Sequence, residues 1–316
     1  MIQRPGQTRH KNCIILCGSY YDYAFLMEFI MPETEKQQYT LRDLQLVEND
    51  ILMKVADVCE NNGIRYTLSS GTLLGALRHR GFIPWDDDVD LEIPVPDYYR
   101  FLEIAQRELG EDYFVQTYMT DPNYHFAYTR IRKNNTAYLD EYQRRYRIHQ
   151  GVWLDIFPLV PVNPGTALKL TRKWLSLCNF IQIQEEIENY REEFEELIGP
   201  VGIFAVGVFS KLPMKTRQKI HRFMLDLVFN VNPEKCSLRA NVWGNITTVF
   251  PREVFDGEAE ELSFEGRLYK VPHDYHKYLE ITYGDYMTLP PVEERRGHCG
   301  KAIVDLENSY EKYMLV

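Results

Sequence analysis

Four aspartates fall within five consecutive positions, in the segment Asp86-Asp-Asp-Val-Asp90, directly before an apolar run that ends at Ile93. So many adjacent anions are electrostatically costly unless a cation compensates them. Alternate residues of a strand point to the same side, so Asp88 and Asp90 project together while Val89 faces the core. The segment therefore predicts a strand that starts at a cation site.

The pair Asp88 and Asp90 has the chemistry of a magnesium site. Two carboxylates on one side are what octahedral, oxygen-preferring Mg²⁺ takes from a protein, with water and substrate phosphates at its other positions. Mn²⁺ is the alternative ion. The competing interpretation is a solvated acidic turn, because Asp is common in turns. The apolar strand, and the stiff approach through Pro84 and Trp85, favour the metal site.

Upstream of the aspartates, Gly71 and Thr72 lie between a predicted strand (64–69) and a predicted short helix (71–78). A glycine lets a phosphate approach the backbone closely, where first-turn N–H groups and the Thr72 hydroxyl can bind it. A Gly-Thr pair alone is weak evidence, so its weight comes from the aspartates that follow.

Asp155 is a lone carboxylate inside the apolar run Val152-Trp-Leu-Asp-Ile-Phe157, and such a group demands a partner. It is either a third metal ligand or the base that activates an acceptor hydroxyl; the alternative is an ion pair with a buried arginine. Arg78, Arg130 and Arg132 are candidate phosphate-binding residues, because a guanidinium can bind two oxygens. Arg130 and Arg132 share a strand face; for each arginine the alternative is an ordinary surface charge.

Near the C-terminus, the segment Tyr283-Gly-Asp-Tyr-Met-Thr-Leu-Pro-Pro291 combines two prolines with aromatic residues. Such a stiff segment could close over the site and bring Arg295 or His298 to the substrate. The alternative is a packed C-terminal strap without a functional role.

The order of elements predicts an α/β (α+β) fold with a mixed sheet flanked by helices. Thr40 and Asp43 form a predicted capping pair for a helix that Gly63 ends. Further expected strands are 89–93, 113–118, 126–132, 136–139 and 152–157, the last ended by Pro158; expected helices are 98–109 and 274–283, and a hairpin over 261–271 turns at Glu265-Gly266.

Composition shifts divide the chain into four expected parts. They are a poorly defined N-terminal extension (1–38), a catalytic core (39–160), a helical subdomain (161–240) and a C-terminal segment that packs back on the core (241–316). The longest apolar stretch, 201–209, is too short to span a membrane. Lys211, Lys215, Arg217 and Lys219 flank that stretch, so contact with a membrane surface is one hypothesis; ordinary packing with solvated charge is the other.

The formal net charge of −10 argues against non-specific binding of nucleic acid, which usually needs a basic face. The six cysteines are scattered and none forms a Cys-x-x-Cys pair, so reduced and mostly buried thiols are expected. These features predict a cytoplasmic protein, with the inner face of the membrane as its other expected location.

Four segments resemble the LicD family of phosphocholine transferases, which is related to fukutin and fukutin-related protein. They are 71–75, 78–90, 153–157 and 283–288, within a similarity that covers roughly residues 40–300. The resemblance implies a nucleotidyltransferase fold whose pattern of Gly-Ser/Thr, Asp-x-Asp and a third acidic residue matches Gly71, Thr72, Asp88, Asp90 and Asp155. Ser70 stands where the family often has a second glycine, a departure that makes this turn less open.

The resemblance further implies metal-dependent transfer of phosphocholine from CDP-choline onto teichoic acid, lipopolysaccharide or capsule. Ribitol phosphate from a CDP donor is the variant of the animal relatives. Partners would be a CDP-linked donor and a glycan or lipid-linked glycan acceptor. The metal and catalytic set is then Asp88, Asp90 and Asp155, and the substrate-binding set is Gly71, Thr72, Arg78, Asp87, Arg130, Arg132, Arg295 and His298.

Two other classes stay open. A nucleotide-sugar glycosyltransferase also uses Asp-x-Asp with a metal, but it releases a nucleoside diphosphate, whereas a LicD-type enzyme releases CMP. The Gly-Thr turn close upstream suits the nucleotidyltransferase pattern better. A non-catalytic cation-binding module is the third alternative, although every acidic position of the pattern is occupied.

Overall fold

The computed structural model describes residues 39–124, 126–139, 147–182, 199–201, 203–204, 207–209, 211–242, 246, 248–297 and 302–314, without the side chains of 176–182. The N-terminal extension (1–38) lies outside the described residues. The boundaries expected between the other three parts of the chain stay predictions.

Helix α3 (Leu41–Asn61) begins at the predicted capping pair. The Thr40 hydroxyl accepts from the Asp43 N–H at 3.2 Å, and the Asp43 carboxylate accepts from the Thr40 N–H at 2.8 Å. These bonds satisfy two N–H groups that a helix start leaves open. The apolar stripe of the helix is buried against the sheet, and Gly63, at φ +59°, follows its C-terminal cap.

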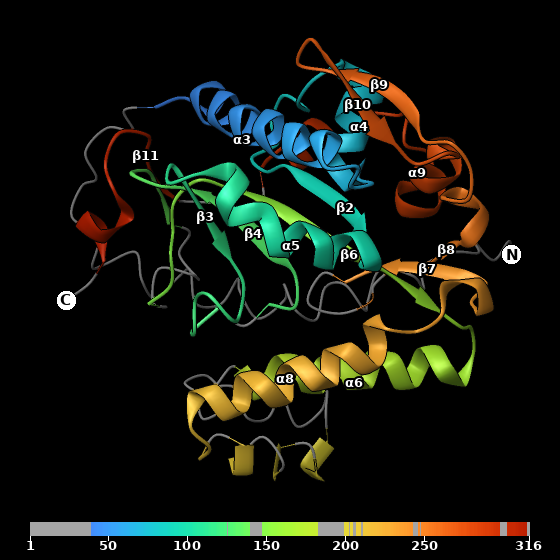
Figure 1. The fold of residues 1–316 in the computed structure, drawn as a ribbon. Coiled ribbons are helices and arrows are strands. Elements are labelled where there is room, and N and C mark those ends of the chain that lie inside the picture. The colour runs from blue at the N-terminus through green and yellow to red at the C-terminus, as the bar shows by residue number, and fades with distance from the viewer. Residues whose placement is uncertain are drawn as a thin grey trace, which may run out of the picture. The chain divides into compact units, whose positions relative to one another are not determined.

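The α/β fold with a mixed sheet is confirmed (Figure 1). Within the described residues, the main sheet has seven strands, with the central order β1-β2-β6-β4-β3. Strand β2 pairs parallel with β6, and the other described pairings of this sheet are antiparallel. The bounds are Thr67–Leu68 (β1), Asp90–Pro94 (β2), Tyr113–Gln116 (β3), Thr129–Lys133 (β4), Trp153–Val162 (β6), Leu238–Asn241 (β7) and Phe250–Pro251 (β8).

The prediction that Pro158 ends its strand is wrong, because β6 continues to Val162. A proline removes only its own N–H from the ladder. Its carbonyl still accepts from the Val242 N–H at 3.3 Å, and beyond it the strand gains β7 as an antiparallel partner. The expected strand 64–69 is also shorter, with only Thr67–Leu68 paired.

Helix α5 (Val95–Leu109) covers one face of the sheet. The hydroxyl groups of Tyr98 on α5 and Thr129 on β4 are hydrogen-bonded at 2.6 Å. Since successive strand residues point to opposite faces, Arg130 projects to the other face. The sheet therefore separates an apolar layer beneath α5 from a polar face on which the candidate site lies.

Several shorter elements surround this frame. Hairpin β9–β10 (Glu260–Phe264, Arg267–Val271) turns at Glu265 and Gly266, as predicted, with both residues at positive φ as a two-residue type I′ turn requires. The remaining elements are helix α4 (Ser70–His79), helix α9 (Tyr275–Tyr283), and the two-stranded sheet of β5 (Ala137–Leu139) and β11 (Ile303–Asp305).

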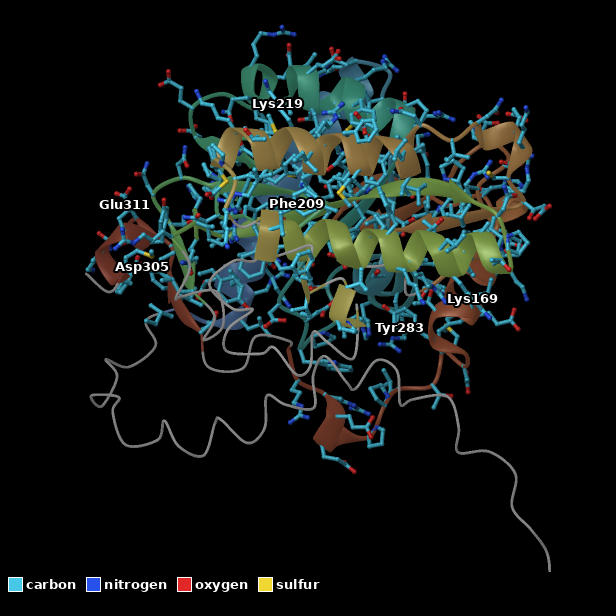
Figure 2. The ribbon with its side chains drawn as sticks, turned by 90° about the horizontal axis from the view of Figure 1, so that it is seen from below. Lys169, Phe209, Lys219, Tyr283, Asp305 and Glu311 are labelled. Atoms are coloured by element: carbon cyan, nitrogen blue, oxygen red, sulfur yellow. The ribbon has the colours of Figure 1, made fainter. Side chains whose placement is uncertain are left out.

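Helices α6 (Thr166–Gln182) and α8 (Met214–Phe229) lie side by side, as Figures 1 and 2 both show. Lys215 and Lys219 are exposed on α8, but Arg217 is buried, so the basic residues of this helix do not share one solvated face. Among the residues that the structure describes, no helix combines the length and apolar sequence needed to cross a bilayer. The described cysteine thiols, of Cys59 and Cys236, are buried and free, as expected.

Candidate active site

Three candidate residues occupy corresponding positions on neighbouring strands. Asp90 of β2 is in register with Asp155 of β6, and Asp155 is in register with Arg130 of β4. Residues in register on adjacent strands project to the same face of a sheet. The strands therefore align two carboxylates and one guanidinium in a row, which we call the acidic row.

Arg130 and Asp155 form a buried ion pair, the alternative that the sequence left open for Asp155. The Arg130 Nε donates to Asp155 Oδ1 at 2.7 Å, and its Nη2 donates to Oδ2 at 3.3 Å. The guanidinium also lies 4.7 Å from the Trp153 ring centroid and donates to the Tyr128 hydroxyl at 3.1 Å. Although burial lowers the pKa of Arg130, the Asp155 charge raises it well above its usual value, so the guanidinium stays charged.

The Gly71-Thr72 turn lies directly against this row. The Asp90 N–H donates to the Thr72 hydroxyl oxygen at 2.9 Å, which ties the start of α4 to the start of β2. A Cβ at Gly71 would lie 2.7 Å from the Asp86 carboxylate, so a side chain there would displace it. The predicted phosphate-binding turn and the predicted acidic cluster are thus in contact.

The expected C-terminal strap also reaches the acidic cluster. Asp87 is buried and accepts from the Tyr138 hydroxyl at 2.9 Å, and a Cβ at Gly297 would lie 2.6 Å from its carboxylate. Tyr283 is 43% exposed as a whole, but desolvation of its hydroxyl, and next the charges of Asp90 and Asp86, raise its pKa. The C-terminal segment therefore approaches Asp87 at Gly297, and its closing over the site stays a prediction.

The other predicted cations differ in what they contact. Arg78 donates to the Tyr286 carbonyl at 3.0 Å, and the Arg295 guanidinium lies 5.4 Å from the Trp85 ring centroid. Arg132 shares the face of Arg130 but is fully buried, donating to Gln116 at 2.7 Å and to the Gly151 carbonyl at 2.8 Å. His298 lies outside the described residues. Phosphate binding by these residues stays a prediction.

Two acidic residues near the site escaped the sequence interpretation. Glu48 on α3 is fully buried, and neither carboxylate oxygen has a hydrogen-bond partner among the described residues. Burial, and next the charges of Asp88 and Asp87, raise its pKa well above the usual value. Glu48 lies between Leu44 and Ile51 on the apolar stripe of the helix. This position was the sequence signal for a buried carboxyl group, because charged residues are rarely found on a buried stripe.

The second is Glu92, two residues beyond Asp90 and therefore on the same face of β2. Its Oε1 accepts from the Ser69 hydroxyl at 2.9 Å, the Tyr278 hydroxyl at 2.8 Å and the Asn241 amide at 3.0 Å. Burial raises the pKa of Glu92 to about 7, against the lowering effect of these bonds. The strand alternation already placed this residue beside the site.

The charge and the donor atoms of the site fit a divalent cation. Within the described residues, no three Asp, Glu, His or Cys side chains lie close enough to ligate one ion, so a third-ligand role for Asp155 stays a prediction. Mg²⁺ needs only one or two carboxylates when phosphates complete its shell. Burial, and next the charge of Asp88, raise the pKa of Asp90, so the carboxylates gathered here favour a compensating cation. All these donors are oxygens, which suits Mg²⁺ or Mn²⁺.

Comparisons with known proteins support a phosphotransferase. Residues 63–185 match the family model described as LicD/FKTN/FKRP, nucleotidyltransferase domain, which includes the acidic row and its turn. This match shows that residues 63–185 are similar to the nucleotidyltransferase domain of that family.

Similarity to individual proteins extends beyond that domain. The lipopolysaccharide cholinephosphotransferase LicD of Haemophilus influenzae is 28% identical over 268 residues, covering 83% of this chain and 97% of that protein. The mouse ribitol 5-phosphate transferase FKRP is 33% identical over 106 residues, which are 32% of this chain and 22% of that protein. Mouse ribitol-5-phosphate transferase FKTN is 33% identical over 87 residues, 28% of this chain and 18% of its own length.

Proposed function

We propose that this chain transfers phosphocholine from CDP-choline onto a hydroxyl of a cell-surface glycan, with Mg²⁺ or Mn²⁺ held by Asp88 and Asp90. The single observation that carries the proposal is the acidic row against the Gly71-Thr72 turn. It offers carboxylates for a cation, N–H groups for a phosphate and a fixed guanidinium on one face. The name of the Haemophilus influenzae relative supports phosphocholine as the group and lipopolysaccharide as the acceptor.

In this reaction the acceptor oxygen forms a bond to the phosphorus that carries choline, and the bond from that phosphorus to the oxygen of CMP breaks. A divalent ion supplies positive charge to the pyrophosphate when bound. First-turn N–H groups of α4 and the Thr72 hydroxyl bind a donor phosphate. Arg130, held by Asp155 and by Trp153, stabilises negative charge on the transferred group. Asp155 orients the acceptor hydroxyl and takes its proton.

A second candidate is transfer of ribitol phosphate from CDP-ribitol. The local similarity to mouse FKRP, a ribitol 5-phosphate transferase, favours it. The chemistry at phosphorus and the released CMP are the same. The two candidates differ only in the head group, which the donor assay below distinguishes.

Nucleotide release tests the proposal. The purified chain is incubated with CDP-choline, CDP-ribitol or UDP-glucose, with and without Mg²⁺, and with a lipopolysaccharide or teichoic acid acceptor. We expect Mg²⁺-dependent CMP release from CDP-choline. Asp88→Ala should lower the rate at least about 100-fold, as loss of a site that stabilises developing charge does. Asp112→Ala, at an exposed turn, is the matched control and should stay within about twofold.

The remaining outcomes separate the alternatives. CMP release from CDP-ribitol alone would replace the proposal with the second candidate. UDP release would make the chain a glycosyltransferase. No nucleotide release from any donor, in the presence of either acceptor, would favour a cation-binding module that does no chemistry.

A further inference from the structure

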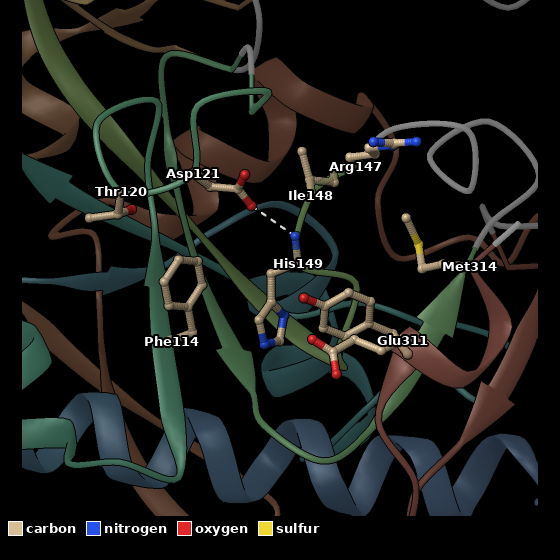
Figure 3. Close-up of a pocket in the computed structure, with 9 residues that line it drawn as sticks. Phe114, Thr120, Asp121, Arg147, Ile148, His149, Glu311 and Met314 are labelled. Carbon is tan, nitrogen blue, oxygen red and sulfur yellow. Dashed lines mark hydrogen bonds between the residues drawn. The ribbon is translucent and has the colours of Figure 1, made fainter. Parts of the chain in front are cut away.

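A second concave site lies apart from the acidic row. A pocket of about 420 Å³ opens between β3, residues 147–149 and the C-terminal 3₁₀ helix η5 (Tyr310–Tyr313), as Figure 3 shows. Ligand sites of small molecules are typically clefts of about 300–1,000 Å³. The pocket is therefore large enough for one ring-sized unit of a ligand.

One wall of the pocket is aromatic and uncharged. His149 stacks on Phe114, with ring centroids 5.1 Å apart and 14° between the planes, and Tyr310 packs on His149 at 4.6 Å. The Nδ1 atom of His149 accepts from the Gly151 N–H at 3.1 Å, so the ring proton is assigned to Nε2. Nε2 then donates to the Asn134 side-chain oxygen at 2.8 Å. Burial and the Arg132 charge lower the pKa of His149 to about 3, so the ring stays neutral.

The rest of the lining includes polar residues, with two carboxylates (Asp121 and Glu311) and one guanidinium (Arg147). Asp121 is fixed, because its Oδ2 accepts from the His149 N–H at 2.8 Å (Figure 3) and from the Gln116 amide at 2.8 Å. Glu311 and Arg147 are exposed at the rim. The two carboxylates can accept hydroxyl hydrogens, and aromatic faces pack against C–H groups. This combination suits a neutral sugar ring better than a nucleotide.

The strand register relates the pocket to the site of transfer. Phe114 is in register with Arg132, and Arg132 with Trp153, so Phe114 lies on the same face as the acidic row and one side-chain row away. Three strand spacings, roughly 14 Å, separate β3 from β2. A donor head group bonded directly to the pyrophosphate cannot span that distance, whereas a glycan acceptor extends over several units.

We infer that this pocket binds a neutral sugar unit of the acceptor glycan, at a distance from the unit that receives the phosphoryl group. The inference rests on the proposed function for its choice of ligand. It assigns Tyr310 and Glu311 to acceptor binding, away from the donor and the cation.

Saturation-transfer NMR on the full chain tests the inference, with neutral trisaccharides of hexose or N-acetylhexosamine units as probes. We expect at least one trisaccharide to bind, and Tyr310→Leu or Glu311→Gln to weaken its Kd by about three- to tenfold. Glu253→Gln, at an exposed carboxylate outside the pocket, is the control. Mg²⁺-dependent CMP release without acceptor should stay within about twofold in all three variants, which also shows that they fold.

Three results would overturn the inference: no trisaccharide binds the wild-type chain, both pocket variants bind as the wild type does, or CMP competes with the sugar. A chain that binds trisaccharides through Tyr310 and Glu311 but releases CMP from no CDP donor would support the sugar site. That result would overturn the proposed function alone.

Discussion

The backbone of Ser70 takes a conformation that favours glycine. Its φ is +47°, in the left-handed region, where a side chain costs about 1 kcal/mol or more. The conformation is held from outside, because the Ser70 N–H donates to the Tyr278 hydroxyl at 3.3 Å. The strain therefore lies directly before the predicted phosphate-binding turn, and the contact with Tyr278 of helix α9 maintains it.

Substitution of Ser70 measures this strain. We expect Ser70→Gly to have a free energy of unfolding about 1 kcal/mol higher than Ser70→Ala, because alanine loses the hydroxyl but keeps the Cβ. Urea denaturation of both variants at one pH gives the difference. An alanine variant as stable as the glycine variant would show that the turn relaxes and that no strain is stored there.

Among the elements, Glu92 joins strand β2 to three neighbours. Its carboxylate accepts from Ser69 before α4, from Tyr278 on α9 and from Asn241 on β7. Each donor is buried or half-buried, and an unsatisfied buried donor costs roughly 1–3 kcal/mol. The Glu92 side chain thus fixes the start of α4, helix α9 and strand β7 relative to Asp90.

Removal of the Glu92 carboxylate should loosen this junction. We expect Glu92→Ala to lower the free energy of unfolding by about 3 kcal/mol or more, since three donors lose their acceptor. Glu92→Gln keeps an acceptor oxygen and should cost about 1 kcal/mol. Glu261→Ala, which breaks only the exposed pair with Lys270, serves as control and should cost under about 0.5 kcal/mol. Equal costs for the alanine and glutamine variants would contradict the network.

For the whole molecule, local signals predicted local structure well. The Thr40 cap and the Glu265-Gly266 turn each depend on a few adjacent residues, and both appear as expected. Strand β2 begins only at Asp90, so the expected alternation of Asp88 with Asp90 stays a prediction. The strand beyond Pro158 did not follow from the sequence, because β7, which continues its pairing, lies far along the chain.

The candidate site likewise depends on contacts between distant segments that the sequence could not predict. Alternation placed Arg130 and Arg132 on one face, but it could not show that Arg130 pairs with Asp155 while Arg132 contacts Gln116. Those contacts depend on the order of β3, β4 and β6 in the sheet. The pocket of Tyr310 and His149 joins segments that are distant in sequence, so no local motif marked it.

His221 is an identifiable source of acid sensitivity of the whole molecule, in addition to His149 in the pocket. The His221 ring is fully buried on α8 and packs on Tyr118, with ring centroids 4.4 Å apart. Neither ring nitrogen has a hydrogen-bond partner in the part of the chain that the structure describes. Burial lowers the pKa of His221 to about 3 from its usual 6.5. Between these values the unfolded chain binds a proton that the folded chain does not, so stability rises with pH there and falls on acidification.

Replacing this ring should flatten the pH dependence of stability. From pH 7.5 to pH 5.0, the free energy of unfolding of the wild-type chain should fall by about 2 kcal/mol because of His221. The His221→Phe variant should not show this fall of about 2 kcal/mol. At pH 7.5 the variant should be about 1 kcal/mol more stable, because two unpartnered nitrogens leave the core while the ring contact with Tyr118 persists. Urea denaturation at both pH values gives the four free energies, and His273→Gln, at an exposed histidine, should keep the wild-type difference. If His221→Phe keeps it too, the buried ring is not the group that makes the fold sensitive to acid.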